Sequence, residues 1–430
     1  MTIETKPDRM SSLSSNAFRY IDSEYDYPFV GDALFNEGIN ISPLPMSSKV
    51  IEERRERHAM FIQFFRICGD IFKNSFQRGG NRAIYRFLLN DAEQWRPISF
   101  YRKFENIVLR PPHFFRTDES ANGKVLEIQC PGSGWGDIDL LTRCYKEMGI
   151  AESFWFDRTG DRCAEMISEI TEQESAHVFH MLDSASNPSS MRYFFRMTQP
   201  PLKYWGYHRD VRYAKVDYVR SHSVRSLFTE NLFETRLTGA IDGKIFFDLP
   251  PNPIFDQKLL LCLPFEPGFR EHFSDNIREM LAFSTLATPD GFRDMTGEFL
   301  SWSDFSKRSA RHRRYFLKYG GCDTNVNWGS RAVFRLDGTN KNLRALLSST
   351  LNAIRRGKPW IVQPEEAQKA VVSAVFRNGN VLSDQEMTSK HSCFYGPGGL
   401  VGIRTMHREH FKVHGQPSTV IGLPGVPTNG

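Results

Sequence analysis

The sequence lacks the features that would place it in several protein classes. Its seven cysteines are widely spaced and include no C-x-x-C pair, which argues against a disulfide framework and against a zinc ribbon. The N-terminus has no apolar signal-peptide core, and the longest apolar runs are too short to span a bilayer. No internal repeat is visible. We therefore expect a protein of a reducing compartment, cytoplasmic and without membrane contact.

Charge shows little bias toward either sign. Charged residues make up 24% of the 430 residues, hydrophobic residues make up 40%, and the net charge is +5. This is the composition of an ordinary globular protein with room for two or three domains. The mild positive charge suits an anionic small substrate as well as nucleic acid. Two basic runs, 54–58 and 306–314, are expected to be solvated surfaces.

The dipeptide Asn122-Gly123 is the clearest local signal in the chain. Asn-Gly is typical of two-residue type I′ turns, in which both central residues need positive φ. A turn of that kind sets Asp118 opposite Glu127 on the two flanking strands. The same register sets Arg116 opposite Gln129. Because side chains alternate along a strand, these four side chains are expected on one face of a hairpin.

Two carboxylates directly opposite each other repel unless a cation lies between them. Carboxylate and amide oxygens are hard donors suited to Mg²⁺, so the hairpin predicts a metal site with Asp118, Glu127 and Gln129 as ligands. The alternative is a solvated sheet face on which each carboxylate is neutralised by a nearby lysine or arginine. The glycine-rich turn at 131–137 follows, and its backbone N–H groups could face an anion.

The pattern of the chain predicts a helical segment followed by two regions that contain strands. The spacing of apolar residues from Ile51 to Phe76 indicates a packing helix, with Ser47 or Ser48 as its cap. Short apolar strands at 153–156 and 176–182 alternate with helical stretches, which is typical of a small α/β lobe with a parallel sheet. The predicted divisions are 1–16, a disordered N-terminus; 17–110, a helical segment; 111–150, the metal-binding strand pair with a helix over 137–148; 151–250, the inserted α/β lobe; and 251–430, a nucleotide-binding region.

Lys318 lies at the end of an apolar strand and before a glycine-containing hairpin. An ammonium group in that position is suited to meet phosphate while the flexible turn closes over it. The alternative is a lysine that only extends its charge into solvent at a strand end.

Taken in order, these features resemble the circularly permuted ATP-grasp ligases typified by the glutathionylspermidine synthase family. FRTDESANGKVLEIQ corresponds to the family's R-x-D and E-x-N strand pair, with Gln129 where the family has asparagine. NPIFDQKLLLCLP has the shape of its asparagine-lysine helix start, with Lys258. LKYGG, WIVQP and GLVGIR correspond to its strand lysine, its hinge glutamine and its arginine strand, with Lys318, Gln363 and Arg404. The resemblance covers about 110–141 and 250–425, and the gap between the two lysines is longer than is usual in the family.

The resemblance implies an α/β (α+β) fold, ATP-grasp-like and circularly permuted, with the small lobe inserted. It also implies an ATP-dependent ligase that joins a carboxylate to an amine through an acyl-phosphate, with ATP and Mg²⁺ as cofactors. In this reading Asp118, Glu127 and Gln129 hold Mg²⁺, and Lys258 and Lys318 clamp the phosphates. Gln363 binds the adenine, and Arg116 and Arg404 stabilise the transferring phosphoryl group and the later oxyanion.

Two other classes of function stay open at this stage. One is a catalytically impaired nucleotide-binding scaffold of the same fold, favoured if Gln129 or the long gap between the lysines disables the site. The other is a nucleic-acid-binding protein that uses the two basic runs and nearby aromatic residues such as Phe64, Phe65 and Tyr315. For the ligase the expected partners are small-molecule carboxylate and amine substrates, with no nucleic acid and no membrane. The lobe at 151–250, with arginines such as Arg220, is where we expect substrate recognition.

Overall fold

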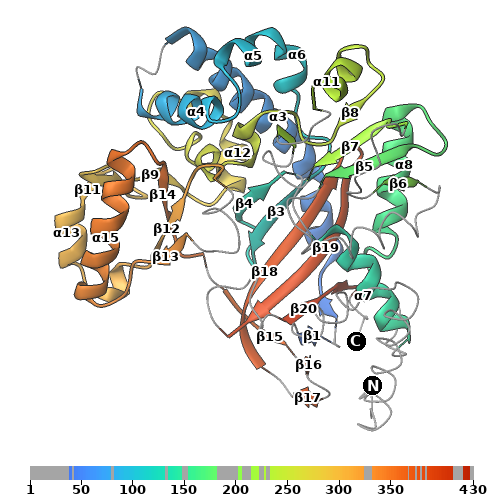
Figure 1. Ribbon diagram of the computed structural model, residues 1–430. Coiled ribbons are helices and arrows are strands. Elements are labelled where there is room, and N and C mark those ends of the chain that lie inside the picture. The colour runs from blue at the N-terminus through green and yellow to red at the C-terminus, as the bar shows by residue number, and fades with distance from the viewer. Residues whose placement is uncertain are drawn as a thin grey trace.

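The computed structural model describes most of the chain. The described residues are 38–40, 43–78, 82–130, 134–147, 154–181, 202–205, 215–221, 227–228, 233–323, 332–366, 368–372, 375–377, 380–382, 385–409 and 420–426. They form a mixed α/β protein with several sheets (Figure 1). The expected disordered N-terminus, 1–16, lies outside the described residues.

A large central sheet carries the predicted hairpin. Its order is β17-β16-β1-β20-β19-β18-β3-β4, with β15 also paired to β18, and every pair is antiparallel except β1 with β20. The strands are β1 (Gly38–Asn40), β3 (Phe115–Ser120), β4 (Val125–Gln129), β15 (Gln368–Val372), β16 (Val375–Arg377), β17 (Asn380–Leu382), β18 (Gln385–Gly396), β19 (Gly399–Arg408) and β20 (Val420–Gly422). The first half of the chain and its last quarter therefore share one sheet.

Helix α3 (Ser48–Arg78) covers one face of this sheet. Ser47 accepts a hydrogen bond from the N–H of Val50 at 3.4 Å, as expected of the cap. The predicted apolar stripe of α3 is buried, and Phe61 and Phe65 pack edge-on against Phe115 of β3. Burial of large aromatic side chains is a strong stabilising contribution, so this packing holds β3 in place on the face that α3 covers.

The opposite face meets a second group of helices and a parallel sheet. Helices α7 (Trp135–Glu147) and α8 (Thr159–Thr171) pack on β18 and β19 through Trp135, Phe394 and Ile138. Beside them lies the sheet β6-β5-β7-β8, whose pairs are all parallel as predicted. Its elements are β5 (His177–Met181), β6 (Lys203–Trp205), β7 (Tyr218–Ser221), α11 (Phe233–Ile241) and β8 (Phe246–Phe247).

A separate lobe, on the left in Figure 1, contains Lys318. Its antiparallel sheet has the order β13-β12-β14-β9 and packs on α13 and α15. The elements are β9 (Thr285–Leu286), β10 (Gly291–Arg293), β11 (Phe299–Ser301), α13 (Trp302–Lys307), η5 (Ala310–His312), β12 (Tyr315–Tyr319), β13 (Val333–Arg335), α15 (Asn340–Arg355) and β14 (Trp360–Pro364). The long gap between Lys258 and Lys318 is therefore occupied largely by this lobe.

The remaining elements lie outside these sheets and helices, and most of them lie between the lobe and α3. They are β2 (Leu44–Pro45), paired with β21 (Pro424–Gly425), then α4 (Ala83–Glu93), α5 (Ile98–Lys103), α6 (Glu105–Val108), η2 (Pro253–Asp256), η3 (Lys258–Cys262), η4 (Arg270–His272) and α12 (Asp275–Met280). The segment predicted to begin a helix near Lys258 forms short 3₁₀ turns, and Asn252 caps the first by accepting the N–H of Ile254 at 3.2 Å.

Two expectations from the sequence are wrong. Residues 154–156, the described part of the strand predicted at 153–156, form no strand, since Phe154 makes only an isolated bridge to Gly425. The run 54–58 is not a fully solvated surface, because Arg54 is buried in an ion pair with Glu119 and Arg57 binds the same carboxylate, both at 3.0 Å. Helix α3 packs on the sheet near these arginines, and they balance an acidic residue of β3 that faces the helix.

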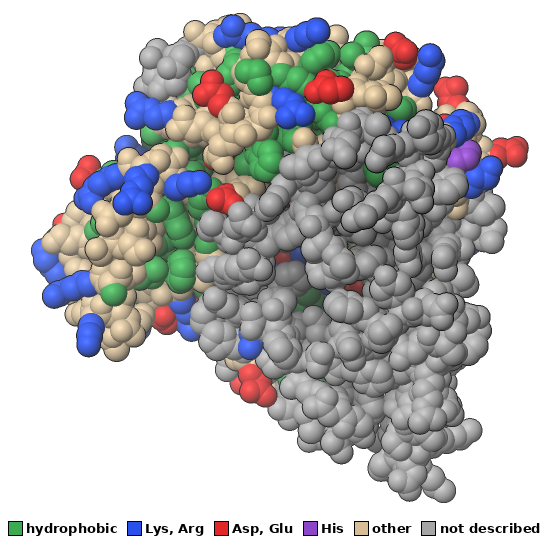
Figure 2. Space-filling view, viewed as in Figure 1, with side chains coloured by type: hydrophobic (Ala, Val, Ile, Leu, Met, Phe, Trp, Pro, Cys, Tyr) green, Lys and Arg blue, Asp and Glu red, His purple; other side chains and the backbone are tan. Residues whose placement is uncertain are grey.

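The run 306–314 is a solvated surface in large part, as expected, and Figure 2 shows many Lys and Arg side chains over its lobe. Phe64 and Phe65 are fully buried, so with Arg54 they cannot form the nucleic-acid interface considered above.

The described cysteine side chains are free and buried. Among the described residues, no helix is long and apolar enough to cross a membrane.

Candidate functional site

The hairpin β3–β4 has the predicted pairs but a different turn. Asp118 lies opposite Glu127 and Arg116 opposite Gln129. The N–H of Gly123 donates to the carbonyl of Ser120 at 2.9 Å, and among Asn122 and Gly123 only Gly123 has positive φ, at 83°. The loop therefore has three residues instead of two. A register shift between Asp118 and Glu119 compensates for the extra residue and restores the predicted pairing.

Four strands place polar side chains in one row. Arg404 on β19 is opposite Ser392 on β18, Ser392 is opposite Asp118 on β3, and Asp118 is opposite Glu127 on β4. Residues directly opposite each other in a sheet point to the same face. The row therefore brings two predicted ligands and a predicted catalytic arginine to one surface, together with a serine that the sequence did not single out.

Asp118 is buried and held by several donors. Its carboxylate lies 3.1 Å from Nε of Arg116, accepts a hydrogen bond from Oγ of Ser392 at 2.8 Å, and lies 2.6 Å from Nζ of Lys390. Removing a carboxylate from water is costly unless such partners are present. The cluster therefore compensates the charge of Asp118 in a site with almost no solvent.

Glu127 has its own lysine. Nζ of Lys258 lies 2.9 Å from its carboxylate, and Nε2 of Gln129 donates to the same oxygen at 3.1 Å. Burial raises the pKa of Glu127, but the charges of Lys258, Lys390 and Lys318 outweigh it and lower the pKa to about 2. Glu127 is therefore ionised near neutral pH.

Lys318 and Gln363 lie on neighbouring strands and contact each other. Nζ of Lys318 donates to Oε1 of Gln363, and Nε2 of Gln363 donates to Oγ of Ser284 at 3.0 Å. Both side chains also reach the carbonyl of Leu126 on β4, each at 3.4 Å. Burial and the nearby Lys258 and Lys390 lower the pKa of Lys318 to about 8, against the opposite influence of Glu127 and Asp118. Gln363 thus lies beside the lysine predicted to bind phosphate, and the adenine contact of Gln363 stays a prediction.

Arg404 is fixed from the first turn of α7. Its guanidinium pairs with Asp137, and Nη2 lies 3.5 Å from Sδ of Met406. Gly134 permits this approach, since a Cβ there would lie 2.7 Å from Nη1 of Arg404 and 3.0 Å from Asp137. Gly134 also has φ of 87°, which favours glycine. Residues 131–133 of the glycine-rich turn lie outside the described residues.

The structure thus brings all eight predicted site residues into one neighbourhood, and it adds Lys390, Ser392 and Asp137. Lys390 and Ser392 lie 272 and 274 residues from the aspartate that they contact. No local pattern reveals such a pairing. Asp137 ends the glycine-rich turn at 131–137. Its acidic side chain at the start of a helix was the sequence feature that could have indicated a site residue.

The described residues include no cluster of three or more His, Cys, Asp or Glu side chains suited to a metal. Asp118 and Glu127 lie among Arg116, Lys258, Lys318 and Lys390, so the local charge is positive. A lone Mg²⁺ would be repelled here, whereas a nucleotide polyphosphate would be attracted. The donor set fits Mg²⁺ only when the phosphates of a nucleotide accompany it.

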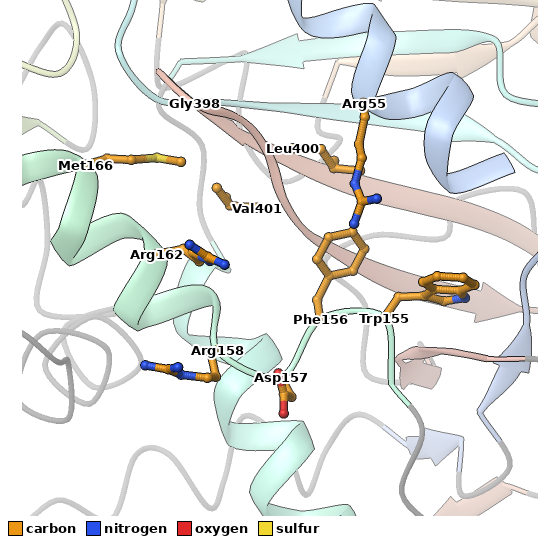
Figure 3. A pocket seen from close by; sticks show the side chains of 10 residues that line it. All are labelled: Arg55, Trp155, Phe156, Asp157, Arg158, Arg162, Met166, Gly398, Leu400 and Val401. Atoms are coloured by element: carbon orange, nitrogen blue, oxygen red, sulfur yellow. The ribbon is translucent and has the colours of Figure 1, made fainter. Parts of the chain in front are cut away.

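A separate pocket of about 340 Å³ lies at the turn between β18 and β19 (Figure 3). Its lining includes Arg55, Arg158, Arg162, Phe156 and Met166, and none of the predicted site residues. Each of the three arginines already pairs with an acidic residue three positions away. The pocket is therefore not a site of uncompensated positive charge.

Comparison with known proteins identifies a fold and no family. No protein-family model matches the chain, and no curated protein matches it. Among solved structures the chain is similar to a glutathione synthetase-like effector from Globodera pallida, determined in the apo form. The TM-score is 0.55 at 14% identity, and the match covers 99% of each chain. This likeness supports a glutathione synthetase-like fold, and at such identity it does not extend to the reaction.

Proposed function

We propose that the chain is an ATP-grasp carboxylate-amine ligase, circularly permuted, which forms an amide bond through an acyl-phosphate. The observation that carries the proposal is the meeting of Asp118 and Glu127 on one sheet with Lys258 and Lys318 from outside it. Two opposed carboxylates beside several lysines suit a metal-nucleotide complex better than either component alone. The glutathione synthetase-like fold of the structural neighbour supports the same class of reaction.

The proposed roles follow from the contacts. Asp118, Glu127 and Gln129 would hold Mg²⁺, which supplies charge neutralisation at the phosphate oxygens when bound. Lys258 and Lys318 would bind phosphates. Arg116 contacts Asp118 directly, so it would orient that carboxylate in addition to its proposed stabilisation of the phosphoryl group.

The proposed chemistry has two steps. A carboxylate oxygen of the acid attacks the γ-phosphorus of ATP, and the bond from that phosphorus to the β,γ-bridging oxygen breaks, which releases ADP. The amine nitrogen then attacks the acyl carbon, phosphate leaves with the former carboxylate oxygen, and the nitrogen loses a proton. Arg404 would stabilise the oxyanion of the second step. Neither step requires a nucleophilic side chain.

We place recognition of the acid and amine in the lobe at 151–250. Of the arginines in that lobe, Arg220 is buried and pairs with Asp248 at 3.2 Å, so it supports the fold of the lobe. Its guanidinium also lies over the ring of Trp135. Arg192, Arg196 and Arg209, three further arginines of the lobe, lie outside the described residues.

The test is a screen of acid and amine pairs for release of ADP and phosphate. With the correct acid and no amine, hydroxylamine should trap the acyl-phosphate as a hydroxamate. Lys318→Ala should slow this partial reaction, because it raises the activation free energy by about 2 to 4 kcal/mol. Lys307→Ala is the matched control, since Lys307 is exposed and pairs with nearby Asp304 at 2.8 Å. Release of AMP and pyrophosphate would contradict the proposal.

One observation favours a second candidate, a nucleotide-binding scaffold without turnover. Two of the three predicted metal ligands are carboxylates, and each is paired with a lysine. Asp118 pairs with Lys390, and Glu127 pairs with Lys258. If those pairs persist when nucleotide binds, no Mg²⁺ can reach the carboxylates. Tight binding of ADP without hydroxamate formation for any acid would support the scaffold over the ligase.

A further inference from the structure

Lysine ammonium groups lie against the carboxylates that would bind metal. Nζ of Lys390 is 2.6 Å from Oδ2 of Asp118, while the other oxygen, Oδ1, accepts a hydrogen bond from Ser392 at 2.8 Å. Arg116 also contacts both oxygens, at 3.1 and 3.3 Å. Each oxygen of Asp118 therefore already has donors before any metal arrives.

The second carboxylate is engaged through one of its two oxygens. Oε1 of Glu127 lies 2.9 Å from Nζ of Lys258 and accepts a hydrogen bond from Nε2 of Gln129 at 3.1 Å. Gln129 thus turns a donor, and not its carbonyl oxygen, toward the site. A divalent cation that bound Asp118, Oε1 of Glu127 and the carbonyl oxygen of Gln129 would have to displace the ammonium groups of Lys390 and Lys258 and rotate this amide, in surroundings that already carry net positive charge.

The two lysines can leave only if another anion accepts them. A lysine ammonium on its flexible stem forms good contacts with phosphate, and nucleotide phosphates would offer that partner. Once Lys390 and Lys258 turn to the phosphates, the carboxylate oxygens are released for metal. Metal and nucleotide then stabilise each other, because each removes the repulsion that opposes the other.

We propose that Lys390 and Lys258 close the metal position in the nucleotide-free protein, so that a divalent cation binds there only together with nucleotide. The inference rests on the proposed nucleotide site and adds its order of assembly. Lys390 is the more informative of the two lysines, because nothing in the sequence had assigned it a role.

The test uses Mn²⁺ as the metal and needs no turnover. Binding of Mn²⁺ to the full chain is measured by electron paramagnetic resonance with and without ADP, with Mn²⁺ plus ADP without protein as the blank. Wild-type protein alone should bind Mn²⁺ weakly, and ADP should increase the affinity by at least about tenfold. Equal affinity with and without ADP would overturn the proposal.

A variant arm tests the same claim without nucleotide. Lys390→Met should bind Mn²⁺ in the absence of ADP at least about tenfold more tightly than wild type, because the competing charge is gone. Lys307→Met, at an exposed site, should match wild type. Unchanged Mn²⁺ affinity in a folded Lys390→Met, or in Lys390→Gln if the first variant does not fold, would also overturn it.

The two proposals fail in different ways. If magnesium and ADP together do not bind to wild-type protein, the proposed function fails, while the variant arm still reports on Lys390. If ADP binds and Mn²⁺ binds equally well without it, only the closed metal position is wrong.

Discussion

Asp118 and Glu127 face each other across two strands, and each carboxylate has a lysine of its own, at 2.6 Å and 2.9 Å. This arrangement holds two negative charges close together without a metal, one on a buried side chain and one on a partly buried side chain. Each lysine can also exchange its carboxylate for a phosphate oxygen, and the carboxylate would then be open to a metal.

The first prediction concerns the two carboxylates. Asp118→Asn and Glu127→Gln should each lower magnesium-dependent ATP turnover on the order of 100-fold or more, because each removes a charged ligand of a hard cation. Circular dichroism should show an unchanged fold, since both substitutions keep the shape of the side chain. Full turnover in either variant at ordinary Mg²⁺ would remove the basis of the metal assignment.

The second prediction concerns pH. The pKa of Lys318 is lowered to about 8 by burial and by nearby lysines. Its protonated form binds phosphate, so the affinity for ADP should be full below pH 8 and should fall as the pH rises above it, by up to about tenfold per pH unit. Lys318→Arg keeps its charge and should lose this dependence. Calorimetric titration of ADP from pH 7 to pH 9.5 measures both, and parallel curves would contradict the assignment.

The third prediction separates a glycine's role in the site from its role in the backbone. Gly134 and Gly243 both have positive φ, so alanine at either should cost roughly 1 to 2 kcal/mol of stability. Only at Gly134 would the new Cβ meet Arg404, at 2.7 Å, whereas at Gly243 nothing lies within 4 Å. Gly134→Ala should therefore reduce ligase turnover and Gly243→Ala should not. Equal turnover in the two variants, at equal melting temperature, would show that the Arg404 position is not critical.

The fourth prediction concerns the back of the sheet. Glu119 is fully buried between Arg54 and Arg57, both at 3.0 Å, and accepts a hydrogen bond from Thr117 at 3.1 Å. Glu119→Ala leaves these arginines without their partner and should lower the free energy of unfolding by about 3 to 5 kcal/mol. Glu52→Ala removes an exposed partner of Arg55 on the same helix and should leave the midpoint of urea unfolding near wild type. Similar midpoints for the two variants would contradict this.

Local patterns predicted the hairpin pairs and the buried stripe of α3, because both depend on neighbours in sequence. The pair Asp118 and Glu127 was correct even though the turn was not, since one extra loop residue and one register shift cancel. The buried Arg54 was missed because its partner, Glu119, is 65 residues away. Lys390 and Ser392 were missed for the same reason, since only the pairing of β18 with β3 brings them to Asp118. Long-range strand pairing is the information that a single sequence does not carry.

The transfer of an oxygen atom tests the central claim most directly. The acid identified by the screen would be labelled with ¹⁸O in its carboxylate and incubated with ATP, Mg²⁺ and the amine, and the products would be analysed by mass spectrometry. An acyl-phosphate gives up one carboxylate oxygen to the departing phosphate, so we predict one ¹⁸O atom in inorganic phosphate and none in ADP. Label in AMP, or unlabelled phosphate beside amide product, would contradict the account.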